Sequence, residues 1–235
     1  MIAGLQKMTL LDYPGKVACT VFLQGCNFRC PFCHNSDLLP GGSADCISEE
    51  ALLSFLQKRK GLLDAVCISG GEPTLYSGLE GLLRQIRALG YLIKLDTNGS
   101  RPAVLETLVK EQLVDYVAMD VKNCPRLYGV TVGVEKISLD PIEESLRFLL
   151  SGEVEYELRT TVVEEFHDEA AIREMGQWLA SLTPERRPGR VYLQPFRDRD
   201  SVLFSGLHTP TGEKTELFRD IMRPFAETVE IRGVD

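Results

Sequence analysis

The chain has 235 residues, of which 44% are hydrophobic and 26% charged, and its formal net charge is −8. This composition is ordinary for a globular protein with a full hydrophobic core, so we expect a single domain over residues 1–235. The acidic charge disfavours nucleic acid as the main ligand, because phosphate contacts dominate the affinity of nucleic-acid-binding proteins.

The sequence also bears on the cellular compartment. No apolar run approaches the roughly 18 residues that a membrane-spanning helix needs. Residues 1–24 do not resemble a secretion signal, because Asp12, Pro14 and Gly15 interrupt their apolar stretch. The chain has seven cysteines, and this odd number fits a reducing cytosol better than a disulfide framework. We therefore expect a cytoplasmic protein that has no membrane partner.

Apolar runs alternate regularly with turn residues along the chain. Buried strands are predicted over residues 17–24, 64–69, 91–96, 115–122, 154–163, 190–196 and 228–232. Helices are predicted at about 48–60 with Ser48 as cap, over 79–89, from Ser100 as cap, from Asp140, from the cap Asp168 to about 182, and near 213–223. Near-continuous apolar strands between helices indicate an α/β fold with a parallel sheet. The six strand–helix units are too few for a closed eight-fold barrel.

The most informative stretch is the loop 25–35, which holds Cys26, Cys30 and Cys33 at the spacing C-x3-C-x2-C. A loop of this length can wrap three thiolates around one compact object. Cubane iron–sulfur clusters are normally held by four cysteine thiolates, so three thiolates would leave one iron open for chemistry. The alternative is a structural zinc site, which needs four ligands and would have to use His34, directly after Cys33.

Other cysteines and two histidines lie outside this loop. Cys19 and Cys67 stand in apolar runs and are expected to be small core residues. Cys46 and Cys124 lie in polar, loop-like surroundings, where either could supply a fourth ligand. Two isolated histidines have no clustered partners and are expected at the surface, namely His167 and His208.

The C-x3-C-x2-C spacing, with the aromatic Phe32 before its last cysteine, resembles the signature of the radical S-adenosylmethionine (SAM) superfamily. Four stretches resemble a narrower group, at residues 2–7, 11–16, 22–27 and 33–35. That group is the longer class of anaerobic ribonucleoside-triphosphate reductase activating proteins, which are relatives of the pyruvate formate-lyase activating enzyme.

This resemblance implies a fold and two cofactors. The fold is a partial (β/α)6 barrel of the radical SAM type, open on one side, with a C-terminal extension over about 198–235. The first cofactor is a [4Fe–4S] cluster, and SAM would fill its open iron. The catalytic residues and metal ligands that the resemblance implies are Cys26, Cys30 and Cys33.

The motif Gly70-Gly71-Glu72-Pro73 follows the predicted strand 64–69. Its simplest interpretation is a tight turn in which an acidic residue favours the start of a helix. The resemblance implies a second role, because in the superfamily such a motif binds the amino group of SAM. The cofactor-binding residues implied in this way are Phe32, Gly70, Gly71, Glu72, Asp96, Thr97, Lys122 and Arg159.

Charged residues end three later strands. Asp96 could simply belong to a polar turn, and Lys122 could form a surface ion pair. Arg159 could face solvent. The resemblance instead places Asp96 and Lys122 against SAM and Arg159 near its ribose and carboxylate. It also allows a monovalent cation bordered by Asp96, Thr97 and Asp120. Arg197 stands where the pyruvate formate-lyase activator has a histidine, which disfavours formate lyase as the partner.

These parts predict an enzyme, a radical SAM activating enzyme. An electron from the reduced cluster, supplied by a flavodoxin or ferredoxin-type donor, would cleave SAM to methionine and a 5′-deoxyadenosyl radical. That radical would take a hydrogen atom from a glycine Cα of an anaerobic ribonucleotide reductase. Two alternatives stay open. One is a small-molecule radical SAM enzyme that resembles 7-carboxy-7-deazaguanine synthase, and the other is a non-catalytic iron–sulfur redox protein.

Overall fold

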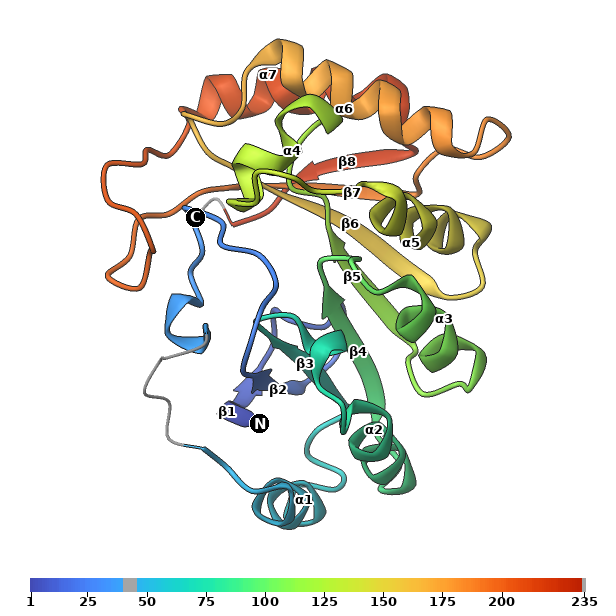
Figure 1. The fold of residues 1–235 in the computed structure, drawn as a ribbon. Coiled ribbons are helices and arrows are strands. Elements are labelled where there is room, and N and C mark those ends of the chain that lie inside the picture. Colours follow the sequence, from blue (N-terminus) through green and yellow to red (C-terminus); the bar gives the residue numbers. More distant parts are fainter. Residues whose placement is uncertain (40–45, 234–235) are drawn as a thin grey trace. The chain divides into compact units, whose positions relative to one another are not determined.

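A computed structural model describes residues 1–39 and 46–233, and Figure 1 follows the elements along the chain. The chain divides into two compact units. The first unit consists of Met1–Asn27, Asn35–Thr97 and Arg101–Ala118, and the second consists of Phe28–His34, Asn98–Ser100 and Met119–Asp235. That these units together make up the single domain expected from the sequence stays a prediction.

The strands are β1 (Ile2–Thr9), β2 (Ala18–Leu23), β3 (Ala65–Gly70), β4 (Leu92–Thr97), β5 (Tyr116–Asp120), β6 (Glu155–Val162), β7 (Arg190–Pro195) and β8 (Thr228–Ile231). They follow chain order in one sheet that ends at β1 and β8, so the sheet is not closed. In the first unit β2, β3 and β4 pair in parallel, and in the second unit β6, β7 and β8 do so. The predicted α/β fold with an open, mostly parallel sheet is confirmed.

The strand β1 was not predicted, and it is antiparallel to β2. The connection 10–17 is too short for a crossover, so the chain can only turn back on itself. Two register shifts interrupt the pairing, and residues 6–8 are all exposed, so the alternation that marks a strand is lost.

The helices are α1 (Glu49–Lys58), α2 (Leu79–Ala88), α3 (Pro102–Lys110), α4 (Pro125–Val132), α5 (Asp140–Ser151), α6 (Glu169–Leu182) and α7 (Gly212–Met222). The predicted caps Ser48 and Asp168 accept hydrogen bonds from backbone N–H groups at the starts of α1 and α6. The predicted cap Ser100 is wrong, because Arg101 occupies the N-cap position of α3 and makes no side-chain capping bond.

The helix α4 was also not predicted. It begins at a proline, contains Gly129, and ends at Gly133, whose φ of 67° lies in the left-handed region. A short segment with glycine and β-branched residues has weak helix propensity, so tertiary contacts decide its conformation. Tyr128 on this helix is fully buried, and its ring meets that of Trp178 edge-on at 6.1 Å. Trp178 is therefore a core residue, as predicted.

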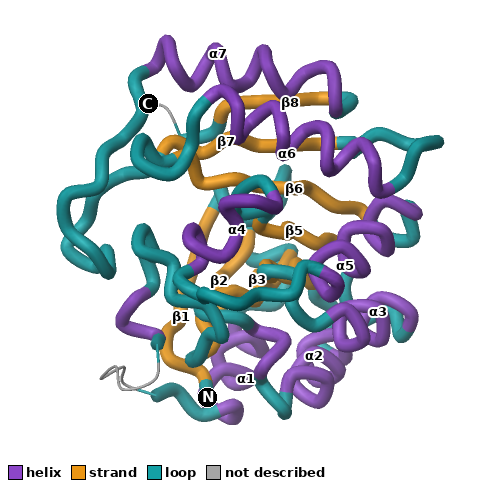
Figure 2. The backbone as a smooth tube through the Cα atoms, turned by 45° about the horizontal axis from the view of Figure 1, so that its top comes forward, coloured by secondary structure: helices purple, strands orange, loops and turns teal. Residues whose placement is uncertain are grey.

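Each unit has its own core. In the first unit a buried cluster joins the segment before β2 to the strands, and it consists of Tyr13, Ala18, Ala65, Cys67 and Tyr116 with Leu92 packed against it. In the second unit α6 and α7 lie side by side next to β7 and β8, as Figure 2 shows. Cys19 and Cys67 are fully buried, which confirms their predicted role in packing. No helix among the described residues is long and apolar enough to cross a membrane.

Candidate functional site

The cysteine loop contributes residues to both units. Cys26 belongs to the first unit, whereas Cys30 and Cys33 belong to the second. Within the second unit the Cys33 N–H donates a hydrogen bond to the Cys30 carbonyl oxygen at 3.0 Å, so the backbone turns between these two thiols. Cys30 is buried and Cys33 half-buried, and none of the chain's seven cysteines, all of them described, forms a disulfide.

Two distant segments of the second unit hold this turn through the backbone. The Arg29 N–H donates to the Val132 carbonyl at the end of α4, at 2.8 Å, and a Cβ on Gly133 would lie 2.3 Å from the Arg29 carbonyl oxygen. The Phe204 N–H donates to the Pro31 carbonyl, between the two cysteines, at 3.0 Å. The unpredicted helix α4 therefore supports the cysteine loop.

Aromatic packing fixes the side chains beside the cysteines. Phe32 is 4% exposed, and its ring centroid lies 5.8 Å from that of Phe166, so Phe32 is a packing residue within this unit. The His34 ring stacks on Phe196 at 5.5 Å, and its Nε2–H donates to the Arg197 carbonyl at 2.6 Å. Burial lowers the pKa of His34, which keeps the imidazole neutral at pH 7. Arg197 thus holds His34 through its backbone.

In the first unit, Gly70 and Gly71 lie directly against the backbone that leads into the cysteine loop. A Cβ on Gly71 would stand 2.0 Å from the Gly25 carbonyl oxygen, and one on Gly70 would stand 2.3 Å from that of Leu23. Because both side chains are absent, the Gly71 N–H donates to Leu23 at 2.9 Å and the Glu72 N–H to Gly25 at 2.7 Å. The glycines therefore fasten the start of the loop to the end of β3.

The carboxylate of Glu72 is the most deeply buried of the predicted SAM contacts, at 1% exposed. Its Oε1 accepts hydrogen bonds from the Thr74 N–H at 3.1 Å, the Thr74 hydroxyl at 2.5 Å and the Thr97 hydroxyl at 2.8 Å. These three donors are neutral, and they fix the orientation of the carboxylate. A buried carboxylate arranged in this way is suited to bind a cation.

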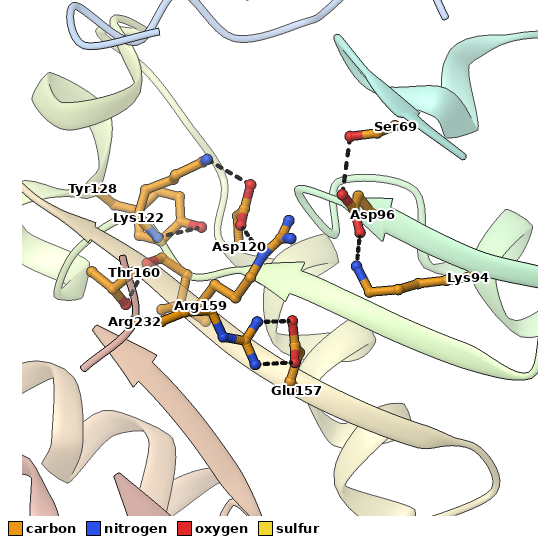
Figure 3. Close-up of polar contacts among 11 residues, drawn as sticks. Ser69, Lys94, Asp96, Asp120, Lys122, Tyr128, Glu157, Arg159, Thr160 and Arg232 are labelled. Atoms are coloured by element: carbon orange, nitrogen blue, oxygen red, sulfur yellow. Dashed lines mark hydrogen bonds and ion pairs between the residues drawn. The ribbon is translucent and has the colours of Figure 1, made fainter. Parts of the chain in front are cut away.

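Asp96, at the end of β4, is held by two neighbours of the first unit. The Lys94 ammonium donates to Asp96 Oδ1, and the Ser69 hydroxyl donates to Oδ2 at 3.0 Å (Figure 3). The Lys94 side chain is 1% exposed and that of Asp96 is 15% exposed. The sequence interpretation did not single out Lys94, although its position two residues before Asp96 places both on one face of the strand.

In the second unit, one carboxylate joins two predicted SAM contacts. Asp120 Oδ2 accepts from the Lys122 ammonium at 2.9 Å, and Oδ1 accepts from Arg159 Nε at 3.0 Å (Figure 3). Burial alone would raise the pKa of Asp120, but the charges of Arg159 and Lys122 lower it to about 2. Burial would lower the pKa of Lys122, but the charges of Asp120 and Cys30 raise it. The alternatives of an exposed ion pair and a solvent-facing arginine do not hold, because both cationic side chains are only 15% exposed.

The prediction that His167 lies at the surface is wrong, because His167 is 1% exposed. Its Nδ1 accepts from the Val163 N–H at 3.1 Å, and its Nε2–H donates to the Lys122 carbonyl at 3.0 Å. Burial lowers the pKa of His167, so the neutral ring is favoured. The ring thereby holds the backbone of Lys122, while His208 is exposed as predicted.

The two candidate fourth ligands, Cys46 and Cys124, differ in their exposure. Cys46 is exposed, but Cys124 is fully buried at the start of α4, so the prediction of polar, loop-like surroundings for Cys124 is wrong. Among residues 1–39 and 46–233, no group of three or more His, Cys, Asp or Glu side chains that could hold a metal ion is found. Cys26 is placed only within the first unit, and Cys30 and Cys33 only within the second.

One sequence relative aligns with the whole chain, and others align with part of it. A protein of Methanocaldococcus jannaschii named "Putative glycyl-radical enzyme activating enzyme" is 30% identical over 244 aligned positions, which cover 100% of this chain and 97% of that protein. The pyruvate formate-lyase-activating enzyme of Clostridium pasteurianum is 32% identical over 127 positions, or 52% of each chain. A 7-carboxy-7-deazaguanine synthase of Koribacter versatilis is 30% identical over 150 positions, or 62% of each chain.

The fold has relatives among solved structures. A domain of the pyruvate-formate lyase-activating enzyme from Bacteroides vulgatus superposes with a TM-score of 0.59 at 22% identity, covering 72% of this chain and 99% of that domain. At this identity the likeness shows the fold, an open α/β sheet of the radical SAM type. The model of the "Radical SAM superfamily" matches residues 20–174, which include the cysteine loop and the strand ends described above. The chain therefore belongs to the radical SAM superfamily, and it is homologous to glycyl-radical enzyme activating enzymes.

Proposed function

We propose that this chain is an activating enzyme that binds a [4Fe–4S] cluster and SAM and generates a glycyl radical on an anaerobic ribonucleotide reductase. The observation that carries the proposal is the buried carboxylate of Glu72, whose backbone is bonded to Gly25 at the start of the cysteine loop. A carboxylate fixed beside a three-cysteine loop is what an enzyme needs to bring a cationic cofactor to a cluster.

The types of side chain match the chemistry of both cofactors. The proposed cluster ligands are Cys26, Cys30 and Cys33, because cysteine thiolates are the usual ligands of iron–sulfur clusters. Glu72 would bind the SAM amino group, and Lys122 its carboxylate. When bound, the reduced cluster supplies the electron that cleaves SAM reductively to methionine and a 5′-deoxyadenosyl radical.

The remaining residues orient and protect these groups. Asp120 holds the charged ends of Lys122 and Arg159 by hydrogen bonds, so neither has to be ordered when SAM binds. His167 fixes the backbone of Lys122, and His34 ties the cysteine loop to the end of β7. We assign Asp96 and Thr97 to the same binding site, and Phe32 to packing beside the thiolates. Gly70 and Gly71 leave room for the loop itself.

The choice of partner rests on the relatives and on the N-terminal residues. The relative that this chain spans over 97% of its length is named as an activating enzyme of glycyl-radical enzymes. Residues 2–7 and 11–16 resemble the activators of anaerobic ribonucleotide reductases, and Arg197 replaces the histidine of the formate-lyase activator. We propose a flavodoxin or ferredoxin-type protein as electron donor. The reducing cytoplasm is the proposed compartment, since none of the seven cysteines forms a disulfide.

One experiment tests this function. Reduced, anaerobically reconstituted protein is mixed with SAM and an anaerobic ribonucleotide reductase whose glycines carry α-deuterium. We expect methionine, deuterium-labelled 5′-deoxyadenosine and a glycyl radical EPR signal on the reductase. The Cys30→Ala variant should give none of these products, whereas the matched control Cys67→Ala should give all of them. SAM cleavage without a radical on any glycyl-radical enzyme would overturn the proposal.

A second candidate is a small-molecule radical enzyme, because the 7-carboxy-7-deazaguanine synthase relative aligns over 62% of this chain. Such an enzyme would turn over a pterin-like compound and would need no protein partner. Incubating the reduced protein with SAM and the pterin-like substrate of that synthase, without any reductase, separates the two. Substrate-dependent formation of 5′-deoxyadenosine in this mixture would favour the second candidate.

A further inference from the structure

The first unit contains a lysine whose position is unusual for its chemistry. The Lys94 side chain is 1% exposed on the same face of β4 as Asp96, to whose Oδ1 it donates. Its neighbour across the sheet is Cys67 on β3. Cys67 is in turn the register partner of Thr20 on β2, whose hydroxyl donates to Asp12, so these groups share one face of the sheet.

A buried ammonium is not explained by stability. Taking a lysine charge out of water carries a large desolvation penalty, and a close ion pair only partly compensates for it. Well-packed apolar residues at such positions are often equally or more stable. The exposed pair of Lys110 with Glu106 on α3 shows the contrast, because its lysine side chain is 57% exposed and avoids this penalty. A second reason for the buried charge is therefore needed.

The geometry of Asp96 supplies that reason. Lys94 occupies one carboxylate oxygen and the Ser69 hydroxyl the other, from two different strands. Because each oxygen accepts from a different side chain, the orientation of the Asp96 carboxylate is fixed. Lys94 also supplies a positive charge that cannot dissociate, at a position where a carboxylate would otherwise attract a cation from solution.

We propose that Lys94 is a positioning residue for SAM, which orients Asp96 and makes SAM binding independent of a dissociable monovalent cation. This inference rests on the proposed function, in which Asp96 contacts SAM. In this role the Lys94 ammonium takes the place of a cation that a relative would bind from solution beside the same carboxylate.

The test measures SAM binding in three buffers of equal ionic strength, in which potassium, sodium or the bulky tetramethylammonium is the only monovalent cation. Reconstituted wild-type protein should bind SAM within about twofold in all three. Lys94→Met should bind about tenfold to a hundredfold more weakly in tetramethylammonium, as expected for loss of a charge-assisted contact, and potassium or sodium should restore part of the affinity. Lys94→Arg should keep most of the wild-type affinity.

Kinetics separate positioning from a merely structural role. In dithionite-driven SAM cleavage, Lys94→Met should raise the KM for SAM while changing kcat little, and its iron content should equal that of the wild type. The matched control Lys110→Met, at the exposed ion pair, should behave as the wild type in every buffer. If Lys94→Met does not fold, the wild-type ion series and the Lys94→Arg variant decide.

The outcomes distinguish the two proposals. Wild-type protein that binds no SAM in any buffer would overturn the proposed function and this inference with it. Wild-type protein that binds SAM only with potassium or sodium would overturn the inference alone. Equal SAM binding by wild type and Lys94→Met in all three buffers would also overturn it alone.

Discussion

The strand ends of the two units carry opposite surpluses of charge. In the first unit the Lys94 ammonium pairs with the carboxylate of Asp96, and neutral donors orient that of Glu72. In the second unit one carboxylate, Asp120, serves two cations, Lys122 and Arg159. Among these six side chains, the first unit therefore holds two carboxylates and one ammonium, and the second holds one carboxylate and two cations.

The proposed function makes use of this difference. The methionine part of SAM carries an ammonium group and a carboxylate, so a zwitterion needs one acidic and one basic partner. Neutral hydroxyl and amide donors orient Glu72, whereas charged donors orient Asp120. The carboxylate of Asp120 thereby holds two cations in place. The role of a buried carboxylate therefore depends on whether its hydrogen-bond donors are charged.

The largest effect should come from the cysteines. Replacing Cys26, Cys30 or Cys33 singly with Ala should abolish the iron–sulfur cluster, because each supplies one of only three proposed thiolate ligands. Cys19→Ala should keep the full complement of about four irons and four sulfides per chain and lose only packing energy. Iron and sulfide analysis after anaerobic reconstitution measures this. A cluster that survives Cys26→Ala would show that Cys26 is not a cluster ligand.

Removing the carboxylate that Lys122 and Arg159 share should destabilise the second unit. Asp120→Asn leaves Lys122 and Arg159, each with a side chain 15% exposed, without their shared carboxylate. We expect a loss of about 2–4 kcal/mol in the free energy of unfolding, because buried charges are then left uncompensated. Urea denaturation checks this value. Glu106→Gln, which breaks an exposed pair, should cost at most about 0.5 kcal/mol. Equal costs for Asp120→Asn and Glu106→Gln would contradict this prediction.

Ligand analogues sharpen the assignment of the two charge surpluses. Glu72→Gln and Lys122→Met should each weaken SAM binding by about tenfold to a hundredfold. Decarboxylated SAM lacks the group that Lys122 would bind, so Lys122→Met should bind it as tightly as the wild type does. Glu72→Gln should still bind this analogue more weakly than the wild type. A double-mutant cycle from equilibrium dialysis gives these couplings, and the reverse pattern would exchange the two roles.

Acid should weaken the second unit first. Burial lowers the pKa of His34 and His167, and both residues belong to that unit. A lowered pKa means that protonation favours the unfolded chain, whose histidines titrate near pH 6.5. The contribution is therefore fully present above about pH 6.5 and is lost as the pH falls toward the lowered folded values. The contribution of Asp120, with its pKa lowered from 3.8 to about 2, should persist until the pH falls below about 4.

Urea titrations at pH 7 and pH 5 measure this effect, which should appear as a lower free energy of unfolding at pH 5. His167→Gln should reduce the difference between the two pH values, whereas the exposed His208→Gln should not change it. A difference that remains in a protein carrying both His34→Gln and His167→Gln would assign the acid sensitivity to other groups.

Local signals predicted most of the elements correctly. Apolar runs located seven strands, and Ser48 and Asp168 were identified as helix caps because a capping residue acts within one turn. The turn at Gly70 and Gly71 was also correctly associated with the end of a strand. These features depend on neighbours in sequence, so a pattern can reveal them.

The features that were missed depend on distant residues. His167 bonds to the carbonyl of Lys122, which is 45 residues earlier, and no spacing rule connects the two. The helix α4 has weak intrinsic propensity and is supported by contacts with Arg29 and Trp178. Lys94 could have been noticed, because a lysine inside an apolar strand that ends in Asp96 is a local conflict. Such a conflict often marks a functional position.

The close approach at Gly71 limits how this protein can change over generations or in the laboratory. Every other amino acid would add a Cβ at 2.0 Å from the Gly25 carbonyl oxygen, and backbone cannot move aside as the end of a flexible side chain can. A variant library that randomises this position would therefore return glycine alone among active clones. Exposed loop side chains such as those of Leu203 and Phe204 can vary far more freely, because they meet solvent instead of backbone.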